Sequence, residues 1–207
     1  EESILYQFGI RFGNLISASV LPLFLTVVLF FGPLVQSVLN GSFSETLGFS
    51  AFRDGFKELR WIRNVIIAPI SEEVAFRACL IPVMSLYLQR STVIQLSPIF
   101  FSVLHLHHIG DMVKRGYSIK SAVLNCTFQA LYTYIFGVYA AFIFCRTRHL
   151  VAPILCHSFC NLMGFPPLTE VFDLGFPQNI ITSLFYVIGL VAWIFLLYPL
   201  TDTRIYQ

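Results

Sequence analysis

The sequence predicts an all-α fold: a polytopic membrane helix bundle of about six or more transmembrane helices. Two observations predict it. Of the 207 residues, 57% are hydrophobic and 12% are charged, whereas soluble domains have roughly 45–50% and 25%. Apolar stretches also recur along the chain at the length of about 20 residues that one helical span requires. We therefore expect a single transmembrane domain over residues 1–207.

Six stretches supply the expected helices. Three are long enough to span a bilayer and contain no Asp, Glu, Lys or Arg: Leu15–Leu39, Ser121–Cys145 and Gln178–Leu200. Three others are interrupted by polar or titratable residues, and we expect them to be helices whose polar faces turn inward: Asn64–Leu88, Thr92–Met112 and Val151–Phe165. The chain begins "EESILYQ" without an initiator methionine, which suggests that further N-terminal spans precede it.

Basic residues are concentrated in two of the connecting loops. The segment 45–63 mixes aromatic and basic residues at near-helical spacing, which suits an interfacial amphipathic helix and, equally, an ordinary linker. A second basic loop is "KRGYSIK" at 114–120. The positive-inside tendency would make the side of these loops cytosolic. The net charge of +2 is small and the basic residues are scattered, so no nucleic-acid partner is expected.

Charged residues occur within one apolar stretch, at "EEVAFR" in positions 72–77. An ionised side chain at mid-bilayer costs roughly 2.5–3.5 kcal/mol on insertion scales, so such residues normally face a protein interior or a wet cavity. Glu73 and Arg77 are one helical turn apart in the favourable acid-before-base order. Glu72 points about 100° around the helix from Glu73, which leaves it available for another role.

Two other expected helices each carry one short polar face. His105 and His108 are three residues apart, with His107 turned away, and His157 and Asn161 are four residues apart. An unpaired buried polar group costs about 1–3 kcal/mol. Convergence of these faces on a single wet cavity is therefore the expected arrangement.

A carboxylate and two imidazoles in such a cavity suit hydrolysis by an activated water. Glu72 would act as the general base, and His105 would help to hold the water. His157 and Asn161 would donate hydrogen bonds to the oxyanion formed at the scissile carbonyl. These roles fit a peptidase.

Three other chemistries remain open on the residues alone. Two histidines and a carboxylate also form a ligand set for zinc or non-haem iron, although the HExxH pattern of a zinc-dependent membrane protease is absent. Cys160 near His157, or Cys79 near Glu72, could be a nucleophile, but thiols in apolar runs are usually inert. A proton-coupled membrane transporter could use Glu72, Arg77 and the histidines as a relay.

Three motifs in this order resemble those of a known family. "EEVAFR" at 72–77 matches EExxxR, "FSVLH" at 101–105 matches FxxxH, and "HSFCN" at 157–161 matches HxxxN. Together they resemble the intramembrane proteases grouped as CAAX proteases and bacteriocin-processing enzymes, and within them the type II CAAX prenyl endopeptidases, or Ras-converting enzymes. The resemblance covers about residues 60–167, which would be the motif-bearing core of a single transmembrane protease domain.

The resemblance implies a multi-pass protein of the endoplasmic reticulum membrane, with its helices around a conical polar cavity and its active site open to the cytosol. The implied reaction removes the C-terminal aaX tripeptide from farnesylated or geranylgeranylated CAAX proteins, such as small GTPases, after the prenylcysteine. By motif position Glu72 activates water with His105, His157 and Asn161 form the oxyanion pair, and Glu73 and Arg77 support them. The family is regarded as metal-independent, so neither a cofactor nor a metal is expected; membrane lipid is the other expected partner.

Overall fold

The computed structural model describes residues 4–207, and every element of this part of the chain is a helix. The predicted all-α class is therefore confirmed. The chain forms two compact units. One comprises Glu72–Leu150 with the N-terminal residues up to Arg11, and the other comprises Phe12–Ser71 with Val151–Gln207. The organisation as one domain stays a prediction.

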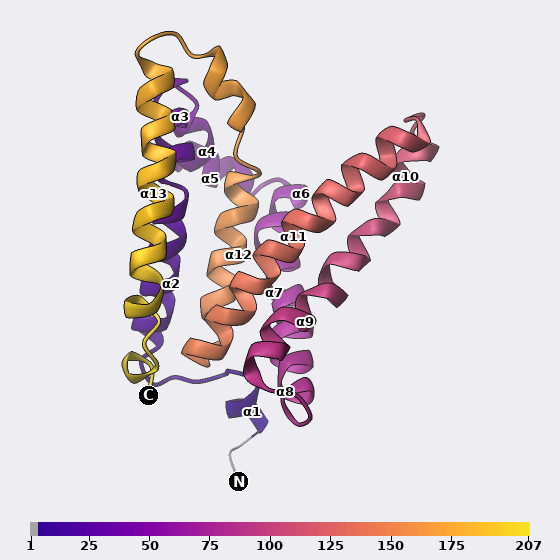
Figure 1. Ribbon diagram of the computed structural model, residues 1–207, viewed down its shortest axis with the longest axis vertical. Helices are drawn as coiled ribbons and strands as arrows, with labels where there is room; N and C mark the ends of the chain where they lie inside the picture. The colour runs from indigo at the N-terminus through magenta and orange to yellow at the C-terminus, as the bar shows by residue number, and fades with distance from the viewer. Residues whose placement is uncertain (1–3) are drawn as a thin grey trace. The chain divides into compact units, whose positions relative to one another are not determined.

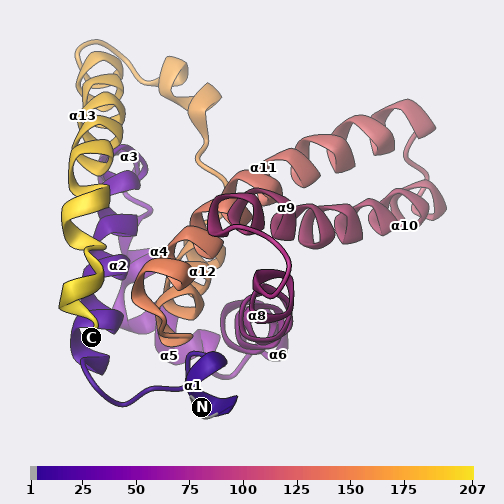
Figure 2. The same ribbon diagram turned by 60° about the horizontal axis from the view of Figure 1, so that its bottom comes forward.

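The first unit is built around a long antiparallel hairpin, seen in both views (Figures 1 and 2). Its elements are α1 (Ile4–Gln7), the π-helical η2 (Val74–Cys79), α8 (Leu80–Ser85), α9 (Arg90–Val103), the 3-10 helix η3 (Leu104–His107), α10 (His108–Lys114) and α11 (Ile119–Thr147). α9 and α10 form one arm of the hairpin and α11 forms the other. α11 begins where the Ser118 hydroxyl accepts a hydrogen bond from Ser121 N at 3.2 Å, because a capping oxygen satisfies an otherwise unpaired backbone donor.

A glycine sets how closely the two arms of the hairpin approach. A Cβ atom added at Gly137 on α11 would lie 2.7 Å from Pro98 Cβ on α9 and 3.5 Å from the Phe101 ring. Contacts below 3.0 Å are not tolerated without movement of one helix. Gly137 is therefore required for the approach that brings α11 against the ring of Phe101.

Gly137→Ala is expected to destabilise the protein by about 1–3 kcal/mol, because the added methyl group overpacks the contact with Pro98. The measurement is thermal unfolding of the purified protein in detergent. Gly110→Ala is the matched control, since Gly110 lies in α10 with no atom within 4 Å of an added Cβ. Equal effects of the two substitutions would contradict this role of Gly137, because alanine in an exposed helix is normally stabilising.

The second unit packs two long apolar helices together with a shorter one. Its elements are α2 (Leu15–Leu29), α3 (Phe31–Leu39), α4 (Phe43–Leu47), α5 (Phe49–Gly55), α6 (Leu59–Ile62), the π-helical η1 (Arg63–Ile67), α12 (Val151–Met163), the 3-10 helix η4 (Leu168–Asp173), α13 (Gln178–Leu200) and the 3-10 helix η5 (Thr203–Ile205). α13 packs on α2 and α3, and α12 packs on α2. A Cβ at Gly189 of α13 would lie 2.7 Å from Val28 O, so this glycine permits the close packing of α13 on α2.

The first expected span is bent. α2 and α3 meet at Phe30 with an angle of 62° between them. Pro33 accounts for the break, since a proline has no N–H to donate to the carbonyl four residues earlier and its ring crowds that carbonyl. The sequence predicted an uninterrupted helix over Leu15–Leu39, and this detail was wrong.

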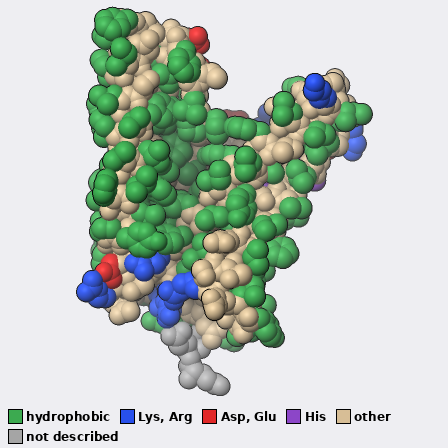
Figure 3. Space-filling view, in the orientation of Figure 1, with side chains coloured by type: hydrophobic (Ala, Val, Ile, Leu, Met, Phe, Trp, Pro, Cys, Tyr) green, Lys and Arg blue, Asp and Glu red, His purple; other side chains and the backbone are tan. Residues whose placement is uncertain are grey.

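By length and composition, three helices of the described chain could cross a membrane: Arg90–Lys114, Ile119–Thr147 and Gln178–Leu200. The bent pair α2–α3 would make a fourth span. α12 is apolar but has 13 residues, about 20 Å of helix, against a hydrocarbon core of about 30 Å. Hydrophobic side chains cover most of the visible surface, with Lys and Arg near the ends of the helices (Figure 3). The chain is thus a membrane protein, and the count of about six spans stays a prediction.

The segment 45–63, for which the spacing left an amphipathic helix and a linker open, forms short helices with breaks at 48 and 56–58. It falls into α4, α5 and α6, and the ring of Trp61 packs against Phe52 and Phe56 at centroid distances of 6.0 and 5.1 Å. Asp54 is exposed and pairs with Lys57 at 2.8 Å and with Arg53 at 3.3 Å, and these hydrogen bonds lower the pKa of Asp54 below its ordinary value. Its place in the membrane interface stays a prediction.

Candidate active site

The "EEVAFR" motif lies where the helix changes its winding. α7 (Ala68–Glu73) ends at the second glutamate, and the π-helical η2 starts at Val74 and contains Arg77. π-helical turns are rare and occur frequently at functional sites, because they displace side chains from the ordinary α-helical register. The sequence predicted a regular helix here and gave no sign of this change.

Glu73 and Arg77 form a buried ion pair. Arg77 Nε lies 3.0 Å from Glu73 Oε2, and the two side chains are 2% and 0% exposed. The pairing predicted from their spacing is confirmed. A buried charge that loses its partner is strongly destabilising, so each of the two residues requires the other.

Arg77 also joins this helix to both arms of the hairpin. Its Nη2 donates to Gly137 O on α11 at 3.4 Å, and its Cζ lies 4.9 Å from the centroid of the Phe101 ring on α9. A guanidinium at this distance from an aromatic face is attracted by the ring quadrupole. Nη1 is buried and has no hydrogen-bond partner among the described residues, so the guanidinium retains donors for a further group.

Phe101 connects this cluster to His105. The Phe101 ring packs against Phe76 at 5.1 Å and edge-on to His105 at 5.2 Å. His105 Nδ1 lies 3.0 Å from Phe101 O. A carbonyl oxygen can only accept a hydrogen bond, so Nδ1 carries the proton and, in the neutral ring, Nε2 presents a lone pair. The backbone therefore fixes both the orientation and the tautomer of His105.

Glu72 lies at the end of α7, one residue before the buried pair. It is half-buried, unlike Glu73, and it is close enough to Arg77 to interact with its charge. This difference agrees with the predicted division, in which Glu73 is compensated and Glu72 faces elsewhere. A partly exposed carboxylate beside a fixed cation can meet water.

His157 and Asn161 both lie on α12, in the second unit. His157 is 5% exposed. Asn161 Nδ2 donates to Asn64 O in η1 at 2.9 Å, which ties α12 to the segment that precedes α7 along the chain. An asparagine amide has two N–H donors, so one donor remains after this bond.

The predicted residues thus fall into two groups. The first unit brings together Glu73, Arg77 and His105 through Phe101, with Glu72 at the adjoining helical position. The second unit holds the oxyanion pair on α12. The convergence of the two groups on one conical polar cavity stays a prediction.

A separate cluster could hold a metal ion. Ligand atoms of His107, His108 and Asp111 all lie within 4.8 Å of one another. Helical spacing predicted that His107 would turn away from its neighbours. In the structure the centroids of the His107 and His108 rings are 3.9 Å apart, because the tighter 3-10 winding of η3 rotates His107. Exposed groups of this kind are common without an ion. The cluster shares no residue with the predicted catalytic set.

Two backbone carbonyls contact the predicted residues and could not be predicted from the sequence. The first is the carbonyl of Gly137, which accepts from Arg77, and the second is the carbonyl of Asn64, which accepts from Asn161. A backbone carbonyl has no signature in the sequence. The glycine itself was the only available signal, because a glycine inside a long apolar helix often marks a close helix contact.

Comparison with known proteins identifies the family. A family model described as "Type II CAAX prenyl endopeptidase Rce1-like" matches residues 55–163. No solved structure matches the chain. The matched residues include all three motifs.

Several curated relatives align along nearly the whole chain. "CAAX prenyl protease 2" of Homo sapiens is 37% identical over 99% of the chain and 64% of its own length. The proteins of the same name from Arabidopsis thaliana and Caenorhabditis elegans are 36% and 32% identical, over 99% and 95% of the chain and 70% and 74% of their own lengths. The chain therefore spans about two thirds of these relatives. It belongs to the type II CAAX prenyl endopeptidase family.

Proposed function

We propose that the chain is an intramembrane endopeptidase that removes the aaX tripeptide from prenylated CAAX proteins. The support is its family and the name "CAAX prenyl protease 2" carried by the relatives. The observation that carries the proposal is the buried Glu73–Arg77 pair, which contacts Phe101 of the second motif and, through it, His105. Two of the three motifs thereby form one cluster.

Glu72 takes a proton from a water molecule, and the oxygen of this water attacks the scissile carbonyl carbon. His105 Nε2 holds the water by accepting its other O–H, since Nδ1–H is committed to Phe101 O. When the tetrahedral intermediate collapses, the C–N bond breaks and Glu72 returns its proton to the leaving amine. A positioned general base of this kind contributes about 10²–10⁴ in rate.

His157 and Asn161 stabilise the oxyanion of that intermediate. Donors fixed before the reaction stabilise the developing charge without reorganisation. The bond from Asn161 Nδ2 to Asn64 O fixes the amide plane, and its second N–H is the donor that the oxyanion uses. His157 is buried on the same helix one turn earlier.

Asn161→Ala is expected to lower kcat by about 10²–10³, as for removal of one oxyanion donor. KM should change little, because the lost interaction forms mainly in the transition state. The measurement is steady-state cleavage of a prenylated CAAX peptide. The control is Asn125→Ala, because the exposed Asn125 amide bonds within its own helix, to Ser121 O at 2.9 Å and Ser121 Oγ at 3.3 Å. A raised KM with unchanged kcat would contradict the oxyanion role.

The substrates are farnesylated or geranylgeranylated proteins with a CAAX terminus, such as small GTPases. A prenyl chain partitions into lipid at about 0.8 kcal/mol per buried CH₂, so only the peptide end has to reach polar groups. Phe100 on α9 is 56% exposed and offers an apolar contact for the prenyl group. Phe101 is 3% exposed and is committed to the cluster around Arg77.

The protein lies in the endoplasmic reticulum membrane with its active site open to the cytosol. Basic residues in the segment 45–63 and in the loop between α10 and α11 support this orientation, because cytosolic loops carry an excess of Lys and Arg.

The test is incubation of the purified protein with a prenylated CAAX peptide, with release of the tripeptide as the readout. Cleavage must require the prenyl group, so an unprenylated peptide cleaved as fast as the prenylated one would refute the substrate assignment.

Activity that survives exhaustive chelation of zinc excludes the metalloprotease alternative. Proton-linked flux in liposomes without peptide cleavage would favour the transporter instead.

A further inference from the structure

Three metal-ligating side chains meet near the tip of the hairpin, outside the proposed catalytic set. They are His107, the last residue of η3, and His108 and Asp111 of α10. One ligand atom from each lies within 4.8 Å of the other two. α10 and the start of α11 form the tip of the hairpin (Figure 1). All three residues belong to the first unit, so their arrangement is set within one compact part of the chain.

Helical spacing directs these three side chains to one place. Asp111 follows His108 by three positions and His107 by four, and residues at these separations are neighbours on a helix surface. A regular α-helix would turn adjacent side chains about 100° apart. The 3-10 winding that ends at His107 instead brings its ring centroid to 3.9 Å from that of His108. The change of winding therefore completes the set of three.

The backbone prepares His107 to act as a ligand. His107 Nδ1 forms a hydrogen bond with Leu104 O. A carbonyl oxygen can only accept, so Nδ1 carries the proton and Nε2 of the neutral ring has the lone pair that a metal ion needs. Metal-binding histidines almost always donate their other ring N–H to a carboxylate, a backbone carbonyl or water. His107 therefore has the second partner that is typical of a metal ligand.

The cluster is open on the side that does not pack against α11. Cys126 Sγ of α11 donates to Met112 Sδ at 3.8 Å, which holds α10 on α11. His107 and Asp111 are exposed and His108 is half-buried. In a tetrahedral zinc site with bonds of about 2 Å, neighbouring ligand atoms lie roughly 3.3 Å apart, so the ligand atoms would have to approach by at most about 1.5 Å. Rotation of the exposed side chains can supply this movement.

The cluster lies toward one end of its candidate membrane span. The span Arg90–Lys114 has 25 residues, about 37 Å of helix, against a hydrocarbon core of about 30 Å. Its end therefore reaches the headgroup layer. Asp111 is three residues from Lys114, about 5 Å along the helix. The basic loop that follows marks this end as cytosolic in the proposed orientation, so ions dissolved in the cytosol can reach the cluster.

Two charged side chains act in opposite directions on a cation at this place. Asp111 and Arg115 are both close enough to His108 to interact with its charge. The Asp111 carboxylate favours a bound cation and the Arg115 guanidinium opposes it. Arg115 is exposed at the end of α10, where water and salt screen its charge. Removal of Arg115 should therefore affect a bound cation in the opposite direction from removal of a ligand.

His105 is not part of this cluster. The centroids of the His105 and His108 rings are 6.3 Å apart, and the His105 ring packs edge-on against Phe101. His105 Nδ1 also lies 3.0 Å from Phe101 O. The cluster is thus adjacent to the proposed catalytic residues and separate from them.

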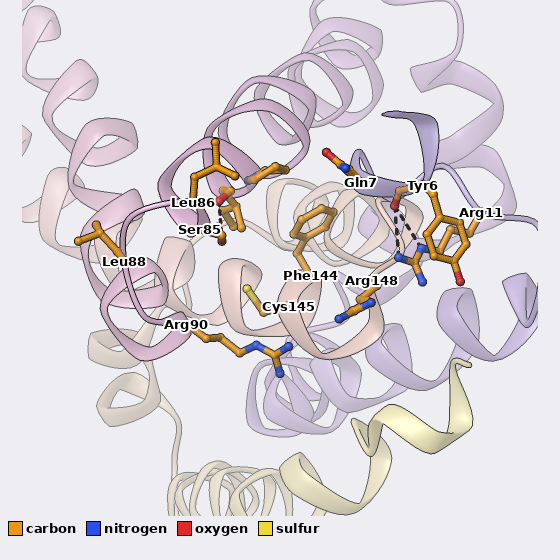
Figure 4. A pocket seen from close by; sticks show the side chains of 12 residues that line it. Tyr6, Gln7, Arg11, Ser85, Leu86, Leu88, Arg90, Phe144, Cys145 and Arg148 are labelled. Atoms are coloured by element: carbon orange, nitrogen blue, oxygen red, sulfur yellow. Dashed lines mark hydrogen bonds between the residues drawn. The ribbon is translucent and has the colours of Figure 1, made fainter. Parts of the chain in front are cut away.

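A pocket of about 440 Å³ elsewhere in the first unit offers no comparable ligand set. Figure 4 shows its walls, which come from α1, the end of α8, the start of α9 and the end of α11. Cys145 lines it but, among the described residues that form its walls, no His, Asp or Glu does. Arg11 donates to Tyr6 O at 3.3 Å and Ser85 to Ile81 O at 2.7 Å (Figure 4). A cation would meet arginines there, without a carboxylate to bind it.

We infer that His107, His108 and Asp111 form a binding site for a divalent transition-metal ion, with Zn²⁺ as the best match. Imidazole suits Zn²⁺, Cu²⁺ and Ni²⁺, whereas Mg²⁺ and Ca²⁺ prefer oxygen ligands. Three protein ligands leave one tetrahedral position for water. The bound ion joins the end of η3, the element that contains His105, to α10. It takes no part in the proposed reaction, and the site does not depend on the proposed peptidase activity.

The test is calorimetric titration of Zn²⁺ into the purified, metal-stripped protein in detergent, without a polyhistidine tag. One ion per chain is expected to bind, and Mg²⁺ at the same concentration should not compete. His107→Ala and Asp111→Asn should each weaken Zn²⁺ binding by about 10²-fold or more, since even the hydrogen-bond partner of a ligand contributes about 10–100-fold. Co²⁺ gives a second readout, because coordination by imidazole changes its visible absorption spectrum.

The matched control for Asp111→Asn is Asp54→Asn, because Asp54 is an exposed aspartate paired with Lys57. It should bind Zn²⁺ as the wild type does. Arg115→Gln is expected to bind Zn²⁺ about two- to fivefold more tightly, the size of effect that an exposed charge has on a neighbour. Without metal, the variants at the exposed His107 and Asp111 should unfold near the wild-type temperature.

Three outcomes would overturn the proposal. The first is a wild-type affinity for Zn²⁺ weaker than about 1 mM. The second is Zn²⁺ binding that survives in the double variant His107→Ala with His108→Ala. The third is loss of Zn²⁺ binding in Glu72→Ala, which would assign the ion to the proposed catalytic set. Each readout is binding and not cleavage, so a failure of this site can be distinguished from a failure of the peptidase proposal.

Discussion

Glu72→Ala is expected to lower tripeptide release by about 10²–10⁴, which would leave it near background. The reason is that no other carboxylate of this cluster can act as the base: Glu73 is 0% exposed and paired with Arg77 at 3.0 Å. A general base contributes a factor of this size when it is correctly placed. The measurement is single-turnover cleavage of a prenylated peptide, which separates chemistry from product release.

The matched control for this substitution is Glu58→Ala, since Glu58 is an exposed glutamate that precedes α6. Glu58→Ala should retain wild-type activity, and both variants should unfold at the wild-type temperature within a few degrees. Glu72→Gln keeps the size of the side chain and should be as inactive as the alanine variant, because an amide cannot take the proton. Full activity in Glu72→Ala would refute the mechanism.

The local part of the site could be predicted because it depends on helical spacing. Arg77 is four positions after Glu73 and His105 is four positions after Phe101, and each pair is in contact in the structure. Neighbours one turn apart on a helix meet whatever the rest of the fold does. The motifs were therefore visible as units in the sequence.

The connections between helices could not be predicted in the same way. Arg77 bonds a carbonyl made accessible by Gly137, and this requires the exact approach of α11 to α9. The bend between α2 and α3 likewise depends on packing, which decides whether the helix breaks near Pro33 or continues through it. Prolines are tolerated in many membrane helices, so the sequence alone does not predict the break. Composition predicts that these segments are helices, but packing decides where they break.

The winding of the "EEVAFR" segment shows the same limit. The periodicity of an α-helix places Glu72 about 100° from Glu73, and this separation agrees with their different burial. The π-helical turn that begins at Val74 changes the angular position around the helix axis of every later residue relative to Glu72. Arg77 still reaches Glu73, because its side chain is long enough to absorb the change.

Arg77→Met is expected to destabilise the protein by about 3–5 kcal/mol, because it leaves the Glu73 carboxylate buried without its cation. The loss should lower the Tm by on the order of 10 °C, measured by thermal unfolding in detergent. Lys57→Met is the matched control, since it removes an exposed cation from its pair with Asp54. Exposed pairs contribute about 0–1 kcal/mol, so this control should unfold near the wild-type temperature.

The double variant Glu73→Leu with Arg77→Met tests whether the ion pair only stabilises the protein or also positions His105. Replacing both members of a buried ion pair with apolar residues is often neutral or stabilising, so most of the lost Tm should return. Tripeptide release should not return, because the guanidinium also contacts the Phe101 ring and Gly137 O, and through Phe101 it positions His105. If activity returned together with stability, the ion pair would have a structural role alone. If the double variant were stable but inactive, Arg77 would be a positioning residue.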